Sequence, residues 1–194
     1  MFDLVAEFDV AEHDSVGHYY KDLIRLFNHL FGELDNTRLV LGESEPIYLP
    51  ANNDCPYHQV IFAHGFFSSA LHEIAHWCIA GQQRRQQVDY GYWYAADGRD
   101  RKQQAEFEQV EVKPQALEWI LSRACQKCFR VSVDNLHGEA TDSAPFKWSV
   151  HQQVLVYCQR GLPTRAALLH RRLSEFYQVP SELLPEYFQL AELG

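Results

Sequence analysis

The 194-residue sequence lacks the features that direct a protein into a membrane or onto nucleic acid. No early apolar run resembles a signal peptide, and no stretch of about 18 apolar residues could span a membrane. Lysine and arginine number 17 against 26 aspartate and glutamate residues, so the formal net charge is −9. An excess of negative charge argues against binding to a phosphate backbone. We therefore expect a cytoplasmic protein with no membrane and no direct nucleic-acid partner.

Cysteine is also scarce, with five residues in a chain that is too large to need disulfides. Without an export signal, we expect reduced thiols in the cytosol. Cys125 and Cys128 have the spacing of a zinc knuckle or a redox pair, but neither a second pair nor a thioredoxin-like unit accompanies them. Two thiols on one late helical turn are the simpler interpretation.

Repeats, low-complexity tracts and recognisable linkers are absent, so we expect one domain over residues 1–194, with 1–17 and 180–194 peripheral. Apolar residues recur at helical spacing in five segments: 18–31, 69–80, 100–128, 147–159 and 164–178. Short apolar runs predict strands or extended segments at 37–42 and 46–50, a strand entering a turn at 58–67, and a strand or loop at 131–139. This content predicts an α+β fold, mostly helical with a small sheet.

The segment SSALHEIAHWCIAG, residues 68–81, contains the pattern His-Glu-x-x-His. Residues four apart share a helix face, so His72 and His76 can direct two imidazoles at one ion, with Glu73 close to that face. The opposite face carries an apolar stripe of Leu71, Ile74, Ala75, Cys78 and Ile79. We expect Ser68 or Ser69 to begin this helix by accepting from a free backbone N–H, and Gly81 to end it.

Two histidines need a third ligand, and the segment FEQVEVKPQALEWILSRA offers Glu108 and Glu111. Its core stripe comprises Phe107, Val110, Pro114, Leu117, Leu121 and Ala124. Glu111 lies inside that stripe, where an ionised carboxylate is costly unless it is paired or bound to metal. Glu108 has a more polar setting, so Glu111 is the better candidate. Pro114 either interrupts a continuous helix near Glu111 or begins a new one.

A site of His72, His76 and Glu111 has the ligands of a catalytic zinc centre with an activated water. The same set matches the two-histidine, one-carboxylate centre of non-haem Fe(II) oxygenases. Ligand identity therefore leaves both hydrolysis and oxygen chemistry open, with one divalent metal ion expected in either case.

The run VIFAHGFFSSA resembles the oxyanion turn of an α/β-hydrolase, but the chain has no Gly-x-Ser-x-Gly elbow. We therefore exclude serine hydrolysis. His64 stands just before the metal-binding helix and could line the site, although a structural histidine in a turn is the simpler interpretation.

Several blocks together resemble one small family, the elongation factor P hydroxylases of bacteria. They keep their order along residues 18–160: EPIYLPA (45–51), FAHGF (62–66), HEIAHWCIAG (72–81), GYWY (91–94), DGRD (97–100) and FEQVEVKPQAL (107–117), with DNL (134–136) as a weaker match. The Trp-Cys pair after the second histidine and the run EVKPQAL are not general features of zinc peptidases. The resemblance is therefore specific.

The resemblance implies a hydroxylase that acts on elongation factor P after a lysyl group has been attached to its lysine. It also implies metal ligation by His72, His76 and Glu111. Oxygen insertion into a C–H bond needs a redox-active centre, which favours Fe(II) over zinc, with O₂ as co-substrate. The sequence does not indicate the electron donor. A zinc-dependent metallopeptidase is the main alternative, and a metal-stabilised binding module is a third.

Under this interpretation, Glu73 would carry protons beside the metal. The cationic lysyl-lysine arm would favour an entrance to the metal site that is lined by carboxylates and aromatic rings. The candidates for lining this entrance are Tyr92, Trp93, Tyr94, Asp97 and Glu108. Arg99 could bind a carboxylate of a co-substrate.

Overall fold

The computed structural model describes residues 17–91, 98–133 and 142–193. Its elements, in chain order, are α1 (Tyr20–Phe31), β1 (Thr37–Leu41), β2 (Ile47–Leu49), β3 (His58–Phe62), α2 (Phe67–Ile79), α3 (Arg101–Ala124), α4 (Ala144–Arg160) and α5 (Thr164–Tyr177). Short 3₁₀ turns form η1 (Arg84–Gln86), η2 (Val88–Gly91), η3 (Pro185–Tyr187) and η4 (Leu190–Leu193). The predicted α+β class, mostly helical with a small sheet, is confirmed.

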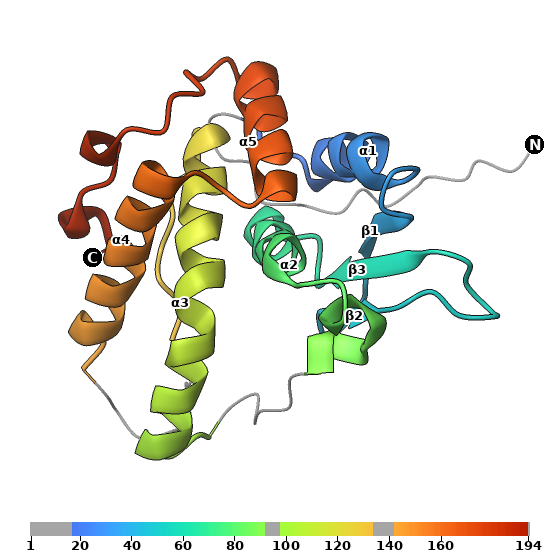
Figure 1. Cartoon of the computed structure of the whole chain (residues 1–194), viewed down its shortest axis with the longest axis horizontal. Coiled ribbons are helices and arrows are strands. Elements are labelled where there is room, and N and C mark those ends of the chain that lie inside the picture. The colour runs from blue at the N-terminus through green and yellow to red at the C-terminus, as the bar shows by residue number, and fades with distance from the viewer. Residues whose placement is uncertain (1–16, 92–97, 134–141, 194) are drawn as a thin grey trace, which may run out of the picture.

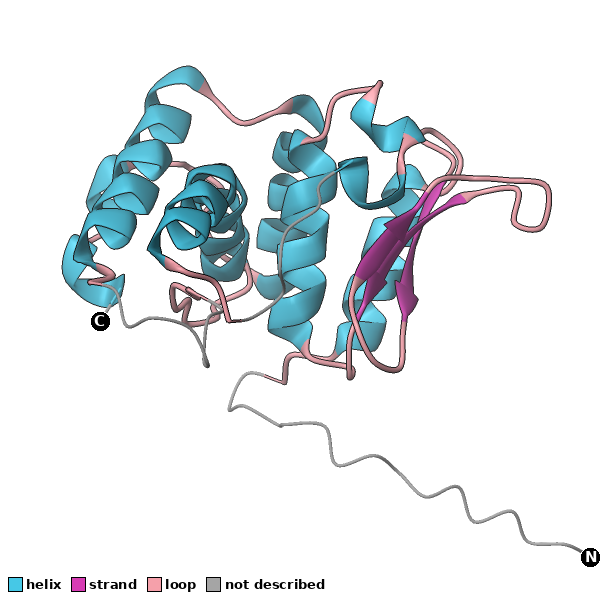
Figure 2. Ribbon diagram, turned by 90° about the horizontal axis from the view of Figure 1, so that it is seen from below, coloured by secondary structure: helices cyan, strands magenta, loops and turns pink. Residues whose placement is uncertain are grey.

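The three-stranded sheet has the order β1-β3-β2, with β1 parallel and β2 antiparallel to β3. Val60 of β3 pairs with Leu39 on one side and with Tyr48 on the other. All three side chains are buried, which fixes the register because a shift by one residue would expose them. Figures 1 and 2 show the sheet at one end of the molecule, with α3 and α4 toward the other.

Helix α2 lies between the sheet and helices α3 and α4 (Figure 1). Most of its predicted apolar stripe is buried: Leu71, Ile74 and Ala75 have no exposed surface, and Ile79 at the end is partly buried. Trp77 is also fully buried, with its ring 5.0 Å from that of Phe27 and 4.8 Å from that of Phe31. The helix that carries the His-Glu-x-x-His pattern is therefore held from several sides by the core.

The ends of α2 differ from the sequence prediction. The helix begins at Phe67, before both serines, and has no side-chain cap. Ser69 instead accepts a hydrogen bond from the backbone N–H of Ala63, at 3.3 Å. The predicted serine cap is wrong because the turn after β3 is short enough to start the helix earlier.

The other end of α2 is capped from a distant part of the chain. The helix ends at Ile79, and Gly81 does not adopt a left-handed conformation. Arg165 of α5 donates to the carbonyls of Trp77 (2.8 Å), Cys78 (3.2 Å) and Ala80 (2.7 Å). These carbonyls have no partner within the helix, so the arginine satisfies them and also complements the helix dipole.

Helix α3 runs without interruption through Pro114, which excludes a new helix starting there. A capping box begins it: Asp100 accepts from the backbone N–H of Gln103 at 2.8 Å, and Gln103 accepts from that of Asp100 at 3.0 Å. The helix ends at Ala124, four residues earlier than predicted. Cys125 and Cys128 therefore lie just beyond it, one buried and one exposed, and both are free thiols.

Residues 131–133 form a loop against α3, and the rest of the segment predicted as strand or loop is outside the described residues. The C-terminal turns bury Phe188 and Leu193, and the ring of Phe188 lies 5.3 Å from that of Trp119. None of the helices in the described parts of the chain is long and apolar enough to cross a membrane.

Candidate metal centre

Two helices bring His72, His76 and Glu111 together. Helix α2 supplies the two imidazoles, and α3 supplies the carboxylate. One ligand atom from each residue lies within 4.8 Å of the others. Nε2 of His76 is 3.1 Å from Oε1 of Glu111, Nε2 of His72 is 3.5 Å from Oε2, and the two Nε2 atoms are 3.1 Å apart. Three possible donor atoms therefore lie close to one point.

The burial of the three residues differs in a graded way. The side chain of Glu111 is 1% exposed, that of His76 is 9%, and that of His72 is 28%. Among the three, His72 is therefore the side chain most open to solvent and Glu111 the most deeply buried.

The chemistry of the donor set fits a divalent metal. Oε1 of Glu111 is buried without a well-aligned hydrogen bond to any described residue. An ionised oxygen in that position is costly unless a cation satisfies it. Two imidazole nitrogens and one carboxylate are the ligands of catalytic zinc and of non-haem iron.

Gln115, one turn after Glu111 on α3, holds the Glu111 carboxylate. Its Nε2 donates to Oε2 of Glu111 at 3.4 Å and to the carbonyl of Ser132 at 2.7 Å. Its Oε1 accepts from the backbone N–H of Ser132 at 3.0 Å. Because both ends of the amide are engaged, Gln115 fixes Glu111 and ties the 131–133 loop to the same helix face.

Glu118 is a polar contact of the site that the sequence analysis missed. Its Oε2 lies 2.9 Å from Nδ1 of His72, the ring nitrogen that faces away from the other ligands. One signal was available in the sequence. Residues seven apart share a helix face, so a carboxylate at 118 lies two turns from Glu111 and points to the same neighbour.

The carboxylates and imidazoles shift one another's pKa values in the metal-free site. Burial opposes charge on His72, but the hydrogen bond to Glu118 and the nearby carboxylates outweigh it and raise the pKa of His72 to about 10. Burial would also raise the pKa of Glu111, but the two imidazoles and the Gln115 amide hold it at about 2. Without metal, the site therefore pairs an imidazolium with a carboxylate.

The two other acidic candidates differ in position. Glu73 is half-buried beside the two histidines, and burial raises its pKa above the ordinary value. Glu108 lies one turn before Glu111 and accepts from Nε2 of Gln104 at 3.0 Å. Glu111, and not Glu108, belongs to the cluster of three ligand atoms.

His64 and Arg99 lie in different surroundings. His64 is exposed in the turn before α2, with a left-handed φ of 55°. Arg99 is buried, and it donates to Gln104 at 3.0 Å and to the carbonyl of Val133 at 3.2 Å. Its guanidinium also lies 3.8 Å from the ring centre of Phe107. Four further candidates lie outside the described residues, namely Tyr92, Trp93, Tyr94 and Asp97.

The turn η2 places an aromatic ring, that of Tyr90, beside His76. The sequence analysis did not identify this contact. Asp89 and Tyr90 have left-handed φ values of 47° and 58°, which are uncommon for residues with side chains. The ring of Tyr90 stacks on that of Tyr48 at 4.3 Å and lies parallel to that of His76 at 6.4 Å. The backbone N–H of Tyr48 donates to Asp89 at 2.8 Å, so the edge of the sheet holds the turn in place.

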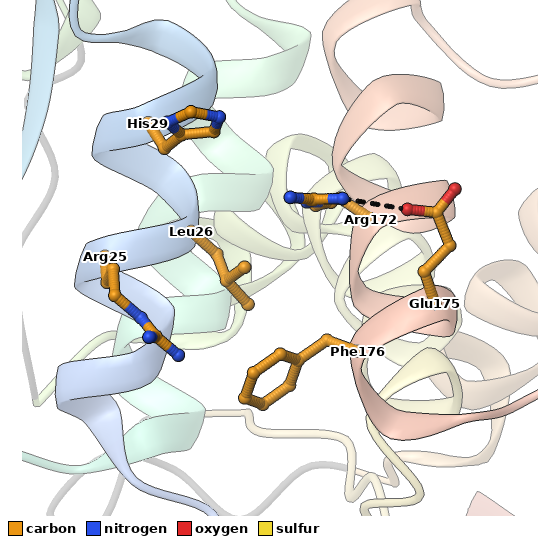
Figure 3. Close-up of a pocket in the computed structure, with 6 residues that line it drawn as sticks. All are labelled: Arg25, Leu26, His29, Arg172, Glu175 and Phe176. Atoms are coloured by element: carbon orange, nitrogen blue, oxygen red, sulfur yellow. Dashed lines mark hydrogen bonds and ion pairs between the residues drawn. The ribbon is translucent and has the colours of Figure 1, made fainter.

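A separate hollow of about 400 Å³ lies between α1 and α5 (Figure 3). Its lining residues are Arg25, Leu26, His29, Arg172, Glu175 and Phe176. Both arginines are paired with a carboxylate on their own helix: Arg25 with Asp22 and Arg172 with Glu175, each at 3.1 Å. None of these residues belongs to the metal cluster.

Comparison with known proteins agrees with the geometry. The family model described as elongation factor P hydroxylase matches residues 26–188. The elongation factor P lysine hydroxylase of Haemophilus influenzae is 52% identical over 166 residues, which cover 86% of this chain and 93% of that protein. The matched range includes His72, His76 and Glu111. The chain belongs to the elongation factor P hydroxylase family.

Proposed function

We propose that this protein is an Fe(II)-dependent monooxygenase that hydroxylates the lysyl-modified lysine of elongation factor P, with O₂ as co-substrate. One observation carries the proposal: in a chain of this family, two helices bring His72, His76 and Glu111 to a single point. The relative from Haemophilus influenzae is named as a lysine hydroxylase of elongation factor P. We expect the reaction to take place in the cytoplasm.

The three side chains would hold the metal and leave part of its coordination sphere open. A bound Fe(II) would supply the redox chemistry that activates O₂, which zinc lacks. One oxygen atom would enter the C–H bond and the other would leave as water, so an external reductant must provide two electrons, and two protons must be taken up. Glu73 lies next to His72 in sequence and beside both histidines, where its carboxyl group can exchange protons with the site.

The charge of the site suits a cationic substrate arm. Three carboxylates, those of Glu73, Glu111 and Glu118, surround the two histidines, so a divalent ion leaves negative charge in excess. Ammonium groups would balance that excess. We further propose that the approach to the site is lined by five candidates from the sequence: His64, Tyr92, Tyr94, Asp97 and Glu108. Arg99, the sixth candidate, is 1% exposed and bonded to Gln104 and Val133, so its role is to support this region from within the fold.

The test incubates the purified protein with Fe(II), O₂, a reductant and lysylated elongation factor P. We expect the mass of the modified factor to increase by one oxygen atom. Unlysylated factor and an anaerobic reaction serve as controls, and neither should gain mass. Cleavage of the factor without oxygen incorporation would instead support a zinc metallopeptidase, and binding without any reaction would support a binding module.

A further inference from the structure

Helix α3 presents a line of buried polar residues toward α2. Glu111, Gln115 and Glu118 follow one another at spacings of four and three, so they lie along one face. Their exposed fractions are only 1%, 1% and 8%. The surrounding half of the helix is apolar core, with Leu117, Ile120 and Leu121 fully buried. Three polar side chains in such a setting need a specific explanation.

Two of the three already have a defined relation to the metal site. Glu111 is the ligand carboxylate, and Gln115 holds it through the 3.4 Å contact to Oε2. Glu118 contacts the other helix instead, through the 2.9 Å hydrogen bond to Nδ1 of His72. The same helix face therefore supplies one ligand and contacts a second.

Stability alone does not account for Glu118. Moving two charges out of water costs free energy that their attraction often fails to repay, and well-packed apolar residues of similar volume are frequently as stable or more stable. A leucine or methionine at position 118 would match its apolar neighbours. A role toward the ligand His72 explains the carboxylate better.

We propose that Glu118 is a positioning residue of the metal centre, which holds the Nδ1–H of His72 and so directs Nε2 of that ring toward the metal. A neutral imidazole carries one proton, and the nitrogen that keeps it cannot bind a metal. Because Glu118 accepts the hydrogen from Nδ1, the lone pair resides on Nε2, which faces Nε2 of His76 at 3.1 Å. Hydrogen bonding to a carboxylate also makes the ligand nitrogen more basic.

The two histidines differ in this respect. In the described part of the chain, no carboxylate is hydrogen-bonded to Nδ1 of His76, and the parallel ring of Tyr90 lies beside it instead. His72 is also the more exposed ligand, at 28% against 9%. The histidine with more freedom to rotate is therefore the one that Glu118 holds.

The inference rests on the metal site of the proposed function, but its test does not depend on the reaction. Metal-free wild type, Glu118→Ala, Glu118→Gln and the control Glu106→Gln are titrated with Co(II), and the visible absorption bands of the bound ion are recorded. Glu106 is an exposed carboxylate on the same helix. Thermal unfolding of each metal-free variant reports whether the fold is intact.

We expect Glu118→Ala to weaken Co(II) binding about 10–100-fold, as other changes of this kind do. Glu118→Gln should lose less, because the amide oxygen still accepts from Nδ1, and Glu106→Gln should bind as the wild type does. In a His72→Ala background, Glu118→Ala should have no further effect on affinity, since the two side chains act as one unit.

Wild-type affinity and an unchanged Co(II) spectrum in Glu118→Ala would overturn the inference. So would an equal loss of affinity with and without His72, which would indicate a general effect on the fold. If instead the Glu118 variants bind Co(II) weakly but the wild type adds no oxygen to elongation factor P, the positioning role stands and the proposed function fails.

Discussion

The two halves of α3 differ sharply in burial. In residues 101–110 only Gln104 and Phe107 are buried, whereas in residues 111–124 only Val112, Lys113 and Arg123 are not. Figure 1 shows the first half reaching away from the other helices and the second half lying among them. Glu111 is the first residue of the buried half. The helix thus places the carboxylate that we propose as a ligand where its buried part begins.

Pro114 lies close to this boundary. It has no backbone N–H, so the carbonyl of Val110 lacks its usual partner within the helix. The helix nevertheless continues, because the residues that follow are packed on all sides against the core. Tertiary packing therefore overrides a local preference for ending the helix there.

The largest contrast should appear between Glu111→Ala and Glu108→Ala, which lie one turn apart on either side of the boundary. We expect Glu111→Ala to lose metal binding and activity by more than about 100-fold, because it removes a direct ligand. Glu108→Ala should keep its metal. Elemental analysis of both variants after loading with Fe(II) under anaerobic conditions measures this. Full occupancy in Glu111→Ala would move the ligand role to Glu108.

The second contrast concerns stability. Leu121 is fully buried, so Leu121→Ala should lower the free energy of unfolding by about 2–5 kcal/mol. Gln109 is exposed in the first half, and Gln109→Ala should change the free energy of unfolding by less than about 0.5 kcal/mol. Urea unfolding of both metal-free variants tests this. Equal effects would show that the two halves do not differ energetically.

The carboxylates of the buried half should also make metal binding depend on pH. They raise the pKa of His72 to about 10 in the metal-free site, so below that pH an incoming ion must displace a proton. Affinity should therefore rise by about tenfold per pH unit between pH 6 and 8. Calorimetric titration with Mn(II) in two buffers of different ionisation enthalpy counts the released protons. A count of zero would mean that His72 is already neutral.

The smallest expected effect comes from a substitution at the exposed N-terminus of α3. Asp100→Ala removes the capping box with Gln103 and should cost about 1 kcal/mol of unfolding free energy. Because this end lies outside the buried half, metal affinity should remain that of the wild type. Thermal unfolding and Co(II) titration measure the two quantities, and a large loss of affinity would show that the halves are coupled.

The amino-acid sequence determined those features of the protein that repeat over a few residues. The four-residue spacing of His72 and His76 defines one helix face whatever surrounds it. The apolar stripe around Glu111 indicated in the same way that this carboxylate is buried. Helix content and the small sheet followed from the same periodicities. Glu118 was accessible by this reasoning too, since it lies two turns after Glu111.

Only the tertiary structure decided which distant residues meet. The Arg165 cap on α2 joins positions more than 80 residues apart, and no local pattern encodes it. Tyr90 reaches His76 through a left-handed turn that the sheet edge stabilises. The apolar stripe favoured Glu111 over Glu108, but only the packing of α3 against α2 brings its carboxylate to within 3.1 Å of His76. Local patterns specify which face of an element is buried, but the partner of that face is set by the packing of the whole chain.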